Sequence, residues 1–325
     1  MAGIKQILFF VFVLSFIACK NEKDTDTASS LSNINEISII IDDVLWNGEV
    51  GDSLRKKLAA PVEGLVQEEP LFTLNQYNEK IFAGKLTKGR NIIVIDTDSV
   101  NAFNFKQNHY CTNQNIFTVK GKSVSELLSL IEMHTDEIIR KIKETEIEEN
   151  QERNKKSGLV DQSLFKSQYG ISINLPTTYT YAIKNEDFVW LKKDIPSGNT
   201  SIVIYRVPCL VVERDKTIIN NIIQMRDSIG NMYIHGQETG AYMVTEEAFS
   251  PYFFTTSHKN KMVFETRGNW EMEKDFMSGP FVNYAIRDDK HNSYLIIEGF
   301  IYSPSSPKRD LIIELESIIR SVEFL

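Results

Sequence analysis

Two neighbouring carboxylates, Asp42 and Asp43, are the best candidates for metal chemistry in this sequence. They follow residues 37–41, a β-branched run that is typical of a buried strand. Carboxylates at the end of a strand can bind Mg²⁺ or act as a general base. No partner motif accompanies the pair, so both residues could equally shape the turn toward Trp46. A metal-dependent hydrolase is therefore kept as an alternative.

A second candidate site combines Arg267, Trp270 and Glu271 within five residues. Arginine and tryptophan are common at recognition surfaces, because the indole supplies contact area and the guanidinium supplies directed donors. We expect binding through these three residues and Trp46. The structural alternative is that Trp270 anchors a loop in the core while Arg267 pairs with Glu271 or Asp275. A Trp270→Ala variant that folds but loses its partner would favour recognition, and unfolding would favour the core.

Other chemical signatures are missing from the sequence. It contains no Gly-x-Ser-x-Gly elbow, no His-Glu-x-x-His and no glycine-rich phosphate loop. The five histidines are scattered without the spacing of metal ligands. We therefore expect no cofactor and favour a role other than catalysis.

Cys19 closes a segment with the features of a secretory signal. Lys5 precedes an apolar run over residues 7–17, and the small residue Ala18 comes directly before the cysteine. Residues 16–19, Phe-Ile-Ala-Cys, resemble the bacterial lipobox. That resemblance implies cleavage before Cys19, lipidation of its sulfur and attachment to a lipid bilayer.

Residues 20–33 are almost wholly polar and lack aromatic side chains, so we expect a flexible tether. Lys20 stands where many lipoproteins retained in the inner membrane have aspartate, which favours the outer membrane. Residues 20–24 also resemble the surface-export signal of Bacteroidota lipoproteins, although the acidic pair is interrupted. The sequence leaves open whether the protein faces the periplasm or the cell surface.

The charge balance disfavours some partners. The chain has 325 residues and a net charge of −8, and this acidic excess argues against nucleic acid. Cys111 and Cys209 could form a disulfide in an oxidising envelope or remain small buried side chains.

Hydrophobic patterning predicts two domains after the signal peptide. In the first domain we expect strands at 37–41, 91–95, 101–107 and 115–119, and a helix capped by Asp52 that ends before Pro61. A long helix over 123–155 follows as a hinge, and its polar end after Ile147 should be solvated.

In the second domain, residues 169–176 alternate like a first strand, and strands are also expected near 188–191, 201–205, 241–245, 261–266, 281–287 and 294–301. Helices are expected over 217–229 and, with Pro307 in its first turn, near the C-terminus. The predicted boundaries are a signal peptide at 1–18, a lipidated tether at 19–34, an N-terminal α/β domain at 35–120, a linking helix at 121–160 and a C-terminal α+β sandwich at 161–325.

Two resemblances accompany this pattern. The order of the second domain, from YGISINLP at 169–176 to the final helix, is similar to the PsbP/Mog/DcrB type of sandwich. Nearly the whole chain resembles a Bacteroidota lipoprotein family of unknown function, through WNGEVGDSLRKKL at 46–58, RGNWEMEKDFMSGPFVNY at 267–284 and GFIYSPSSPKRDLI at 299–312. The first resemblance implies protein–protein contacts, and the second implies no activity.

The sequence thus predicts an α+β protein with two α/β domains and mainly antiparallel sheets, joined by a long helix. We expect a lipid-anchored envelope lipoprotein that acts as a protein-binding or assembly module with an envelope protein as partner. The alternatives are a hydrolase using Asp42 and Asp43, or a carrier for a small apolar ligand.

Overall fold

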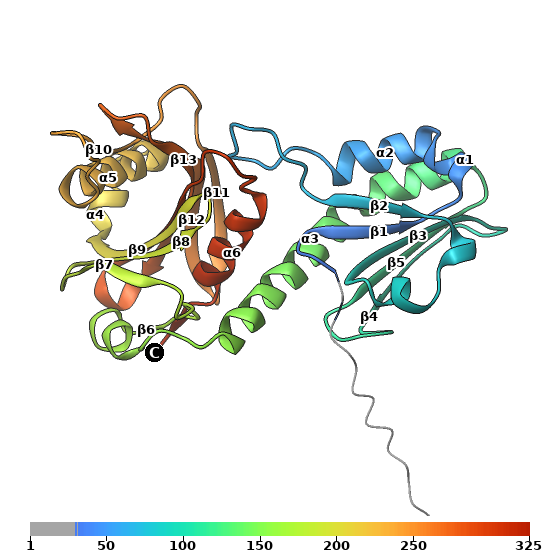
Figure 1. Ribbon diagram of the computed structural model, residues 1–325, viewed down its shortest axis with the longest axis horizontal. Coiled ribbons are helices and arrows are strands. Elements are labelled where there is room, and N and C mark those ends of the chain that lie inside the picture. The colour runs from blue at the N-terminus through green and yellow to red at the C-terminus, as the bar shows by residue number, and fades with distance from the viewer. Residues whose placement is uncertain (1–29, 31) are drawn as a thin grey trace, which may run out of the picture.

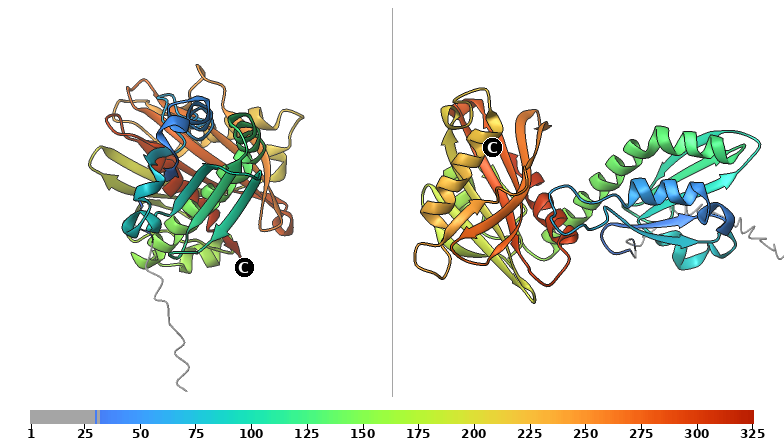
Figure 2. Two further views of the ribbon diagram at one scale, coloured as in Figure 1. Left: turned by 90° about the vertical axis from the view of Figure 1, so that its right-hand side faces the viewer. Right: turned by 90° about the horizontal axis from the view of Figure 1, so that it is seen from above.

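The computed structural model describes residue 30 and residues 32–325. These residues form two units, each built on its own sheet (Figure 1): an N-terminal unit over 36–156 and a C-terminal unit over 165–324. Figure 2 shows the units next to each other along the long axis, with the long helix α3 reaching from one to the other. The predicted signal peptide and Cys19 lie outside the described residues.

The N-terminal unit contains a five-stranded sheet in the order β2-β1-β3-β5-β4. The pairings β1–β2, β1–β3 and β3–β5 are parallel, and β4–β5 is antiparallel. Ile37, Ile39 and Ile93 are fully buried, which explains the β-branched composition of the central strands. The bounds are β1 (Glu36–Ile40), β2 (Thr73–Tyr77), β3 (Asn91–Thr97), β4 (Ala102–Gln107) and β5 (Asn115–Gly121).

Helices cover one face of this sheet and form the core of the unit with it. Leu54 of α2 and Ile138 of α3 belong to the same buried cluster as Ile39 of β1. The opposite face carries a smaller apolar cluster around Ile40 and Ile92. The helix bounds are α1 (Asp43–Trp46), α2 (Glu49–Leu58), η1 (Glu79–Ile81), η2 (Gly84–Lys88) and α3 (Val124–Lys156).

The C-terminal unit contains an eight-stranded antiparallel sheet. Its order is β10-β12-β13-β14-β9-β8-β7, and β11 pairs with β12 beside this path. The central strand β14 is buried on both faces, as its apolar run Leu295–Ile297 requires. The bounds are β7 (Thr180–Lys184), β8 (Phe188–Ile195), β9 (Gly198–Pro208), β10 (Tyr242–Thr245), β11 (Tyr252–His258), β12 (Lys261–Glu273), β13 (Ser278–Asp288) and β14 (Ser293–Tyr302).

Helices lie on both faces of the eight-stranded sheet. The α6 side chains Leu315 and Ile318 pack on one face, and Ile222 and Met225 of α5 pack on the other. The remaining elements are η3 (Phe165–Tyr169, a π-helical turn), β6 (Ile171–Ser172), α4 (Cys209–Val212), α5 (Ile218–Tyr233), η4 (Asp289–His291), α6 (Arg309–Arg320) and β15 (Glu323–Phe324).

The prediction of a mixed fold with mainly antiparallel sheets and a long helix is confirmed for the chain as a whole. The first sheet departs from it, since most of its pairings are parallel. The predicted strand over 169–176 is wrong: residues 171–172 alone form a strand, because the preceding residues coil into the π-helical turn. Strands β2, β7 and β11 were not predicted.

Three smaller helix predictions are corrected by the structure. Asp52 does not cap α2, because that helix begins one turn earlier with Gly48 as its N-cap. Pro307 lies just outside α6, whose N-cap is Lys308. The polar end of α3 is not fully solvated, since Asn150 and Asn154 are buried.

The end of α3 packs against α6 through amide side chains. Gln151 Nε2 donates to the Ser317 carbonyl oxygen at 3.0 Å, and Asn154 lies beside the same serine. Hydrogen bonds of this kind let a helix face without an apolar stripe pack against another helix. The fading of the apolar pattern after Ile147 therefore marks a polar contact with the C-terminal unit.

Glu69 provides a second contact between the units. This nine-tenths buried carboxylate lies in the loop between α2 and β2, and it accepts from Lys308 N at 2.6 Å and Arg309 N at 2.9 Å. These amides open α6, where the backbone donors lack partners within the helix and the helix dipole favours negative charge. A residue of the N-terminal unit thus caps a helix of the C-terminal unit.

Replacing Glu69 with alanine should lower the free energy of unfolding by about 1.5–3 kcal/mol, because two hydrogen bonds to a charged group are lost. Urea denaturation followed by circular dichroism measures this change. Glu68→Ala is the matched control, since Glu68 is exposed and should stay within about 0.5 kcal/mol of the parent. Equal effects of the two substitutions would contradict the capping role.

Candidate functional site

The carboxylates Asp42 and Asp43 are exposed and hold the turn between β1 and α1. Asp42 is the N-cap of α1, and its Oδ1 accepts from Val44 N at 2.8 Å. Asp43 Oδ1 accepts from Gln76 Nε2 at 2.9 Å. Among the described residues, no three histidine, cysteine, aspartate or glutamate side chains are grouped to hold a metal ion. The geometry therefore supports the turn-forming role of the pair.

Trp46 is half-buried at the end of α1 and packs on the core of the N-terminal unit. The Arg55 guanidinium lies over its ring, with 4.5 Å between Cζ and the ring centroid, and donates to the Trp46 carbonyl oxygen. A cation over an indole face is a stabilising arrangement. Trp46 thus joins α1 to α2.

Arg267 belongs to a partly buried ion-pair cluster that joins β12 to α6. Its guanidinium donates to Glu316 Oε2 at 2.8 Å and to Glu265. Burial raises the pKa of the Glu316 carboxyl, but the charges of Arg267, Arg320 and Lys143 and the hydrogen bond from Arg267 together hold it below its usual range. The expected pairing of Arg267 with Glu271 or Asp275 is wrong. Residues two apart on a strand share a face, so Glu265 is the neighbour of Arg267 on β12, whereas Glu271 lies four residues away.

Trp270 is only 1 % exposed and lies in the core between β12 and α5. Its Nε1 donates to the Ile301 carbonyl oxygen at 3.1 Å, and its ring meets Phe300 edge to face. The sequence predicted a loop here, but both Trp270 and the half-buried Glu271 are on β12, and Glu271 is paired across the sheet with Val244 and Ser278. Burial and the charge of Glu271 raise the pKa of nearby Glu246.

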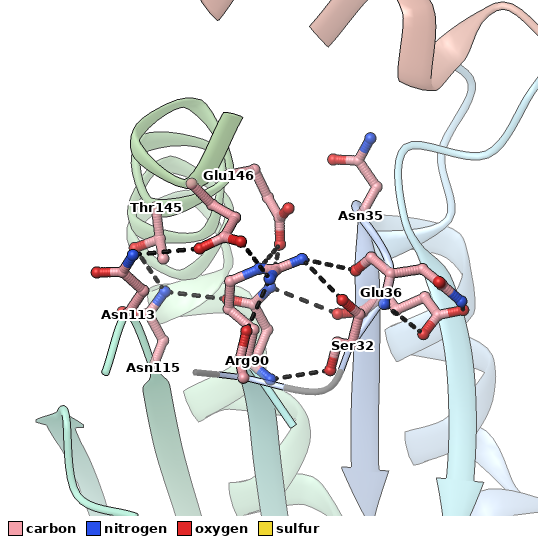
Figure 3. Close-up of polar contacts among 12 residues, drawn as sticks. Ser32, Asn35, Glu36, Arg90, Asn113, Asn115, Thr145 and Glu146 are labelled. Carbon is pink, nitrogen blue, oxygen red and sulfur yellow. Dashed lines mark hydrogen bonds and ion pairs between the residues drawn. The ribbon is translucent and has the colours of Figure 1, made fainter. Parts of the chain in front are cut away.

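A buried polar cluster around Arg90 ties the start of β3 to α3 (Figure 3). Arg90 and Glu146 are both fully buried, and Arg90 Nε donates to Glu146 Oε1 at 2.9 Å. Asn91 Nδ2 donates to the same oxygen at 2.6 Å. Asn115 connects Asn91 with Thr145 of α3. Each of these side chains has at least one protein partner, although Glu146 Oε2 and Asn115 Oδ1 are buried without one. The contacts between β3, β5 and α3 give the cluster a structural role.

The same arginine holds the chain just before β1. Arg90 Nη1 donates to Ser30 Oγ at 2.8 Å, and Nη2 donates to the Asn33 carbonyl oxygen at 2.7 Å. The Arg90 backbone amide donates to Ser32 Oγ at 2.9 Å. The end of the predicted tether is therefore fixed at the amino end of the first sheet.

Cys111 and Cys209 are free and buried, in the N-terminal and C-terminal units respectively. Burial raises the pKa of both thiols. Such thiols are protonated at neutral pH and react slowly. The structure therefore favours their role as small buried side chains.

One apolar surface lies between α4 and α5, and sequence reasoning missed it. Leu210 is 73 % exposed, Met232 61 % and Val211 38 %. They line a groove of about 540 Å³ whose remaining apolar lining includes Met225 and Ile229. We call these five residues the α4–α5 surface. Grouped exposed apolar side chains mark interaction sites, whereas single ones are ordinary.

Hydrogen-bonded polar side chains border this surface. Arg214 Nη2 donates to Gln224 Oε1 at 2.6 Å and to Asn221 Oδ1 at 3.0 Å. An apolar centre with a polar rim is the usual anatomy of a protein interface. Methionine adapts to differently shaped partners because its side chain is flexible and polarisable.

The sequence held a partial signal for the α4–α5 surface. Residues 209–212 are an apolar run, and Met232 continues the stripe of Met225 and Ile229 at helical spacing. Such a stripe predicts burial, since most apolar faces are covered. Its exposure becomes visible only when the covering elements are known.

The structure is thus that of a two-unit α+β protein with an exposed apolar surface between α4 and α5. The chain belongs to a family described as a domain of unknown function (DUF4837), whose model matches residues 159–321, half of the chain. A second family of unknown function (DUF8532) matches residues 30–155. No curated protein matches the chain.

Two solved structures are similar to part of the chain. They are the Ran-binding protein Mog1p of Saccharomyces cerevisiae and a mutant of the protein Mog1, at 9 % and 10 % identity. Each match covers 48 % of this chain and 90 % of the other, with a TM-score of 0.31. A TM-score this low supports no inference about this chain. In residue 30 and residues 32–325, no helix is both long and apolar enough to cross a membrane.

Proposed function

We propose that the protein is a lipid-anchored binding module of the bacterial cell envelope, which recognises a protein partner through the α4–α5 surface. The observation that carries this proposal is the grouping of Leu210, Val211 and Met232 at an apolar groove. Removal of such an apolar surface from water by a bound partner lowers the free energy, and therefore favours binding. The absence of a grouped metal-ligand set among the described residues leaves the hydrolase alternative without support.

The anchor is proposed from the sequence. The lipobox-like residues 16–19 favour lipidation at Cys19, and Lys20 favours the outer membrane. Ser30, whose side chain contacts Arg90, lies only eleven positions after Cys19. A chain of that length reaches at most about 40 Å. A lipid anchor at Cys19 would therefore keep the N-terminal unit close to the lipid surface.

A pair of double variants tests the partner site. Leu210→Lys with Met232→Lys places two charges on the α4–α5 surface. Because burying these charges against a partner is costly, the variant should lose in-cell cross-linking to the partner. Val44→Lys with Met133→Lys is the matched control, because Val44 and Met133 are 81 % and 72 % exposed and lie on α1 and α3. The control should keep both fold and partner.

The anchor is tested separately with Cys19→Ala. This variant should no longer be found in the membrane fraction. The mass of its N-terminal peptide should lack the contribution of the acyl chains. Unchanged capture by the double variant on the α4–α5 surface would reject the partner site. An unacylated Cys19 in the parent protein would reject the anchor.

A further inference from the structure

Strand β11 is an edge of the eight-stranded sheet. It pairs with β12 along its full length, from Tyr252 opposite Arg267 to His258 opposite Lys261. On its other side, no strand of the described chain pairs with it. Alternate residues of an antiparallel strand direct their N–H and C=O groups to opposite sides. Among the described residues, no backbone–backbone hydrogen bond joins β11 to any segment other than β12.

The composition of β11 lacks the charges that usually protect an edge. The strand, Tyr252–His258, contains no lysine, arginine, aspartate or glutamate, and Pro251 lies just before it. The opposite edge of the sheet, β7, carries Lys184 and a register shift between Tyr181 and Ile183, and β10 has only four residues. Charges, irregularities and shortness all discourage strand addition. β11 is therefore the edge of this sheet that is best suited to accept another strand.

A cleft of about 570 Å³ lies beside this edge. Three consecutive residues of β11, Phe254 to Thr256, line it, so the cleft reaches the strand edge as well as one face. The loop after α2 forms the opposite wall with Pro61 and Val62, and Ile139 of α3 adds a further apolar side chain. Phe254 is 37 % exposed there.

The charges around the cleft are nearly balanced. Arg267 is paired with two carboxylates, and Lys57 is paired with Glu132 at 2.6 Å. The remaining charged groups lining the cleft, Lys143 and Glu63, have opposite signs. This balance favours an occupant without net charge over a charged small molecule. The apolar lining side chains, which include Val62, Ile139 and Phe254, can contact apolar side chains of such an occupant.

We propose that β11 is a strand-addition site, at which an extended segment of a partner protein pairs with the open edge and places alternate apolar side chains in the cleft. Main-chain hydrogen bonds would supply affinity, and the Phe254 wall would select the side chains. A single added strand needs about 4.8 Å beside β11. A second copy of the chain would instead have to bring an entire sheet edge against the loop after α2.

This site is independent of the α4–α5 surface. Phe254 pairs with Glu265, and alternate residues of β12 place Glu265 and Arg267 on the face that α6 covers. The α4–α5 surface belongs to the other face of the sheet. Either site can fail its test without affecting the other.

A displayed library of random seven-residue peptides, selected on the full mature chain, tests the proposal. We expect enrichment of peptides with apolar residues at alternate positions. A selected peptide should slow amide hydrogen exchange within 252–258. Phe254→Lys with Thr256→Lys should weaken its binding by at least about tenfold, because charges on an edge oppose strand addition.

Thr180→Lys with Ala182→Lys on β7 is the matched control, since both residues are exposed on the other edge of the sheet. It should bind the peptide as the parent does. No enriched peptide, unchanged binding by the β11 variant, or protection confined to other segments would overturn the proposal. A dimer in light scattering that dissociates in the β11 variant would replace the partner segment with a second copy.

Discussion

Replacing Arg90 with methionine should lower the free energy of unfolding by about 3–5 kcal/mol, because it leaves the Glu146 carboxylate buried without its cation. Both side chains are fully buried, and Arg90 also holds Ser30 and the Asn33 carbonyl oxygen. The variant loses these contacts together. Urea denaturation of the mature chain gives the free energy, and hydrogen exchange should show that the N-terminal unit opens first.

Two comparisons isolate the cause of this loss. Arg140→Met removes an exposed i,i+4 pair with Glu144 on the same helix as Glu146, and should cost no more than about 0.5 kcal/mol. Adding Glu146→Gln to Arg90→Met removes the orphan charge while keeping an acceptor for Asn91, so it should recover part of the stability. A loss as small for Arg90→Met as for Arg140→Met would show that the cluster does not hold the unit together.

Trp270→Ala should lower the free energy of unfolding by about 3–5 kcal/mol, as large-to-small changes in a core do. The residue is 1 % exposed, packs on Phe300 and donates to the Ile301 carbonyl oxygen. The substitution creates a cavity and leaves that buried oxygen without its donor. Thermal unfolding, followed by the far-ultraviolet circular dichroism of the backbone, measures the loss.

The controls for Trp270 separate packing from the hydrogen bond. Trp270→Phe keeps most of the ring and should lose only about 1–3 kcal/mol, the cost of an unsatisfied buried acceptor. Phe276→Ala, at a fully exposed aromatic residue, should stay within about 0.5 kcal/mol of the parent. A stable Trp270→Ala variant that loses its partner would restore the recognition role expected from the sequence.

The buried strands were predictable because their apolar side chains form a recognisable pattern in the sequence. Residues 37–41, 91–95 and 294–301 are mostly apolar, and they form most of β1, β3 and β14. By contrast, β2 has the sequence Thr-Leu-Asn-Gln-Tyr, which shows no strand pattern. It forms by pairing with β1 at the edge of the sheet. Tertiary context, and not local preference, determines such a strand.

The contacts between the units could not be predicted from local patterns. Glu69 caps α6 from a position 239 residues away from Lys308, and nothing in the intervening sequence specifies that contact. The same holds for Arg267, whose partner Glu316 is on another element. Charged residues in a sequence indicate possible pairs, but the fold selects which of them meet.

For the candidate binding residues, side-chain type and exposure also disagree. Trp270 and Arg267 have the side-chain types of a recognition surface, yet Trp270 is buried in the core and Arg267 is paired with Glu265 and Glu316. Leu210 and Met232 have the pattern of a core, yet both are exposed. Residue type predicts what a side chain can do, and only the arrangement of neighbouring elements shows whether a partner can reach it.

Site-specific photo-cross-linking in living cells tests the central claim most directly. A photoreactive amino acid at position 232, in the tagged chain with Cys19 intact, should cross-link to one envelope protein. The same amino acid at position 133, a comparably exposed methionine on α3, should not capture that protein. Equal capture from both positions, or no protein captured from position 232, would contradict the proposed role of the α4–α5 surface.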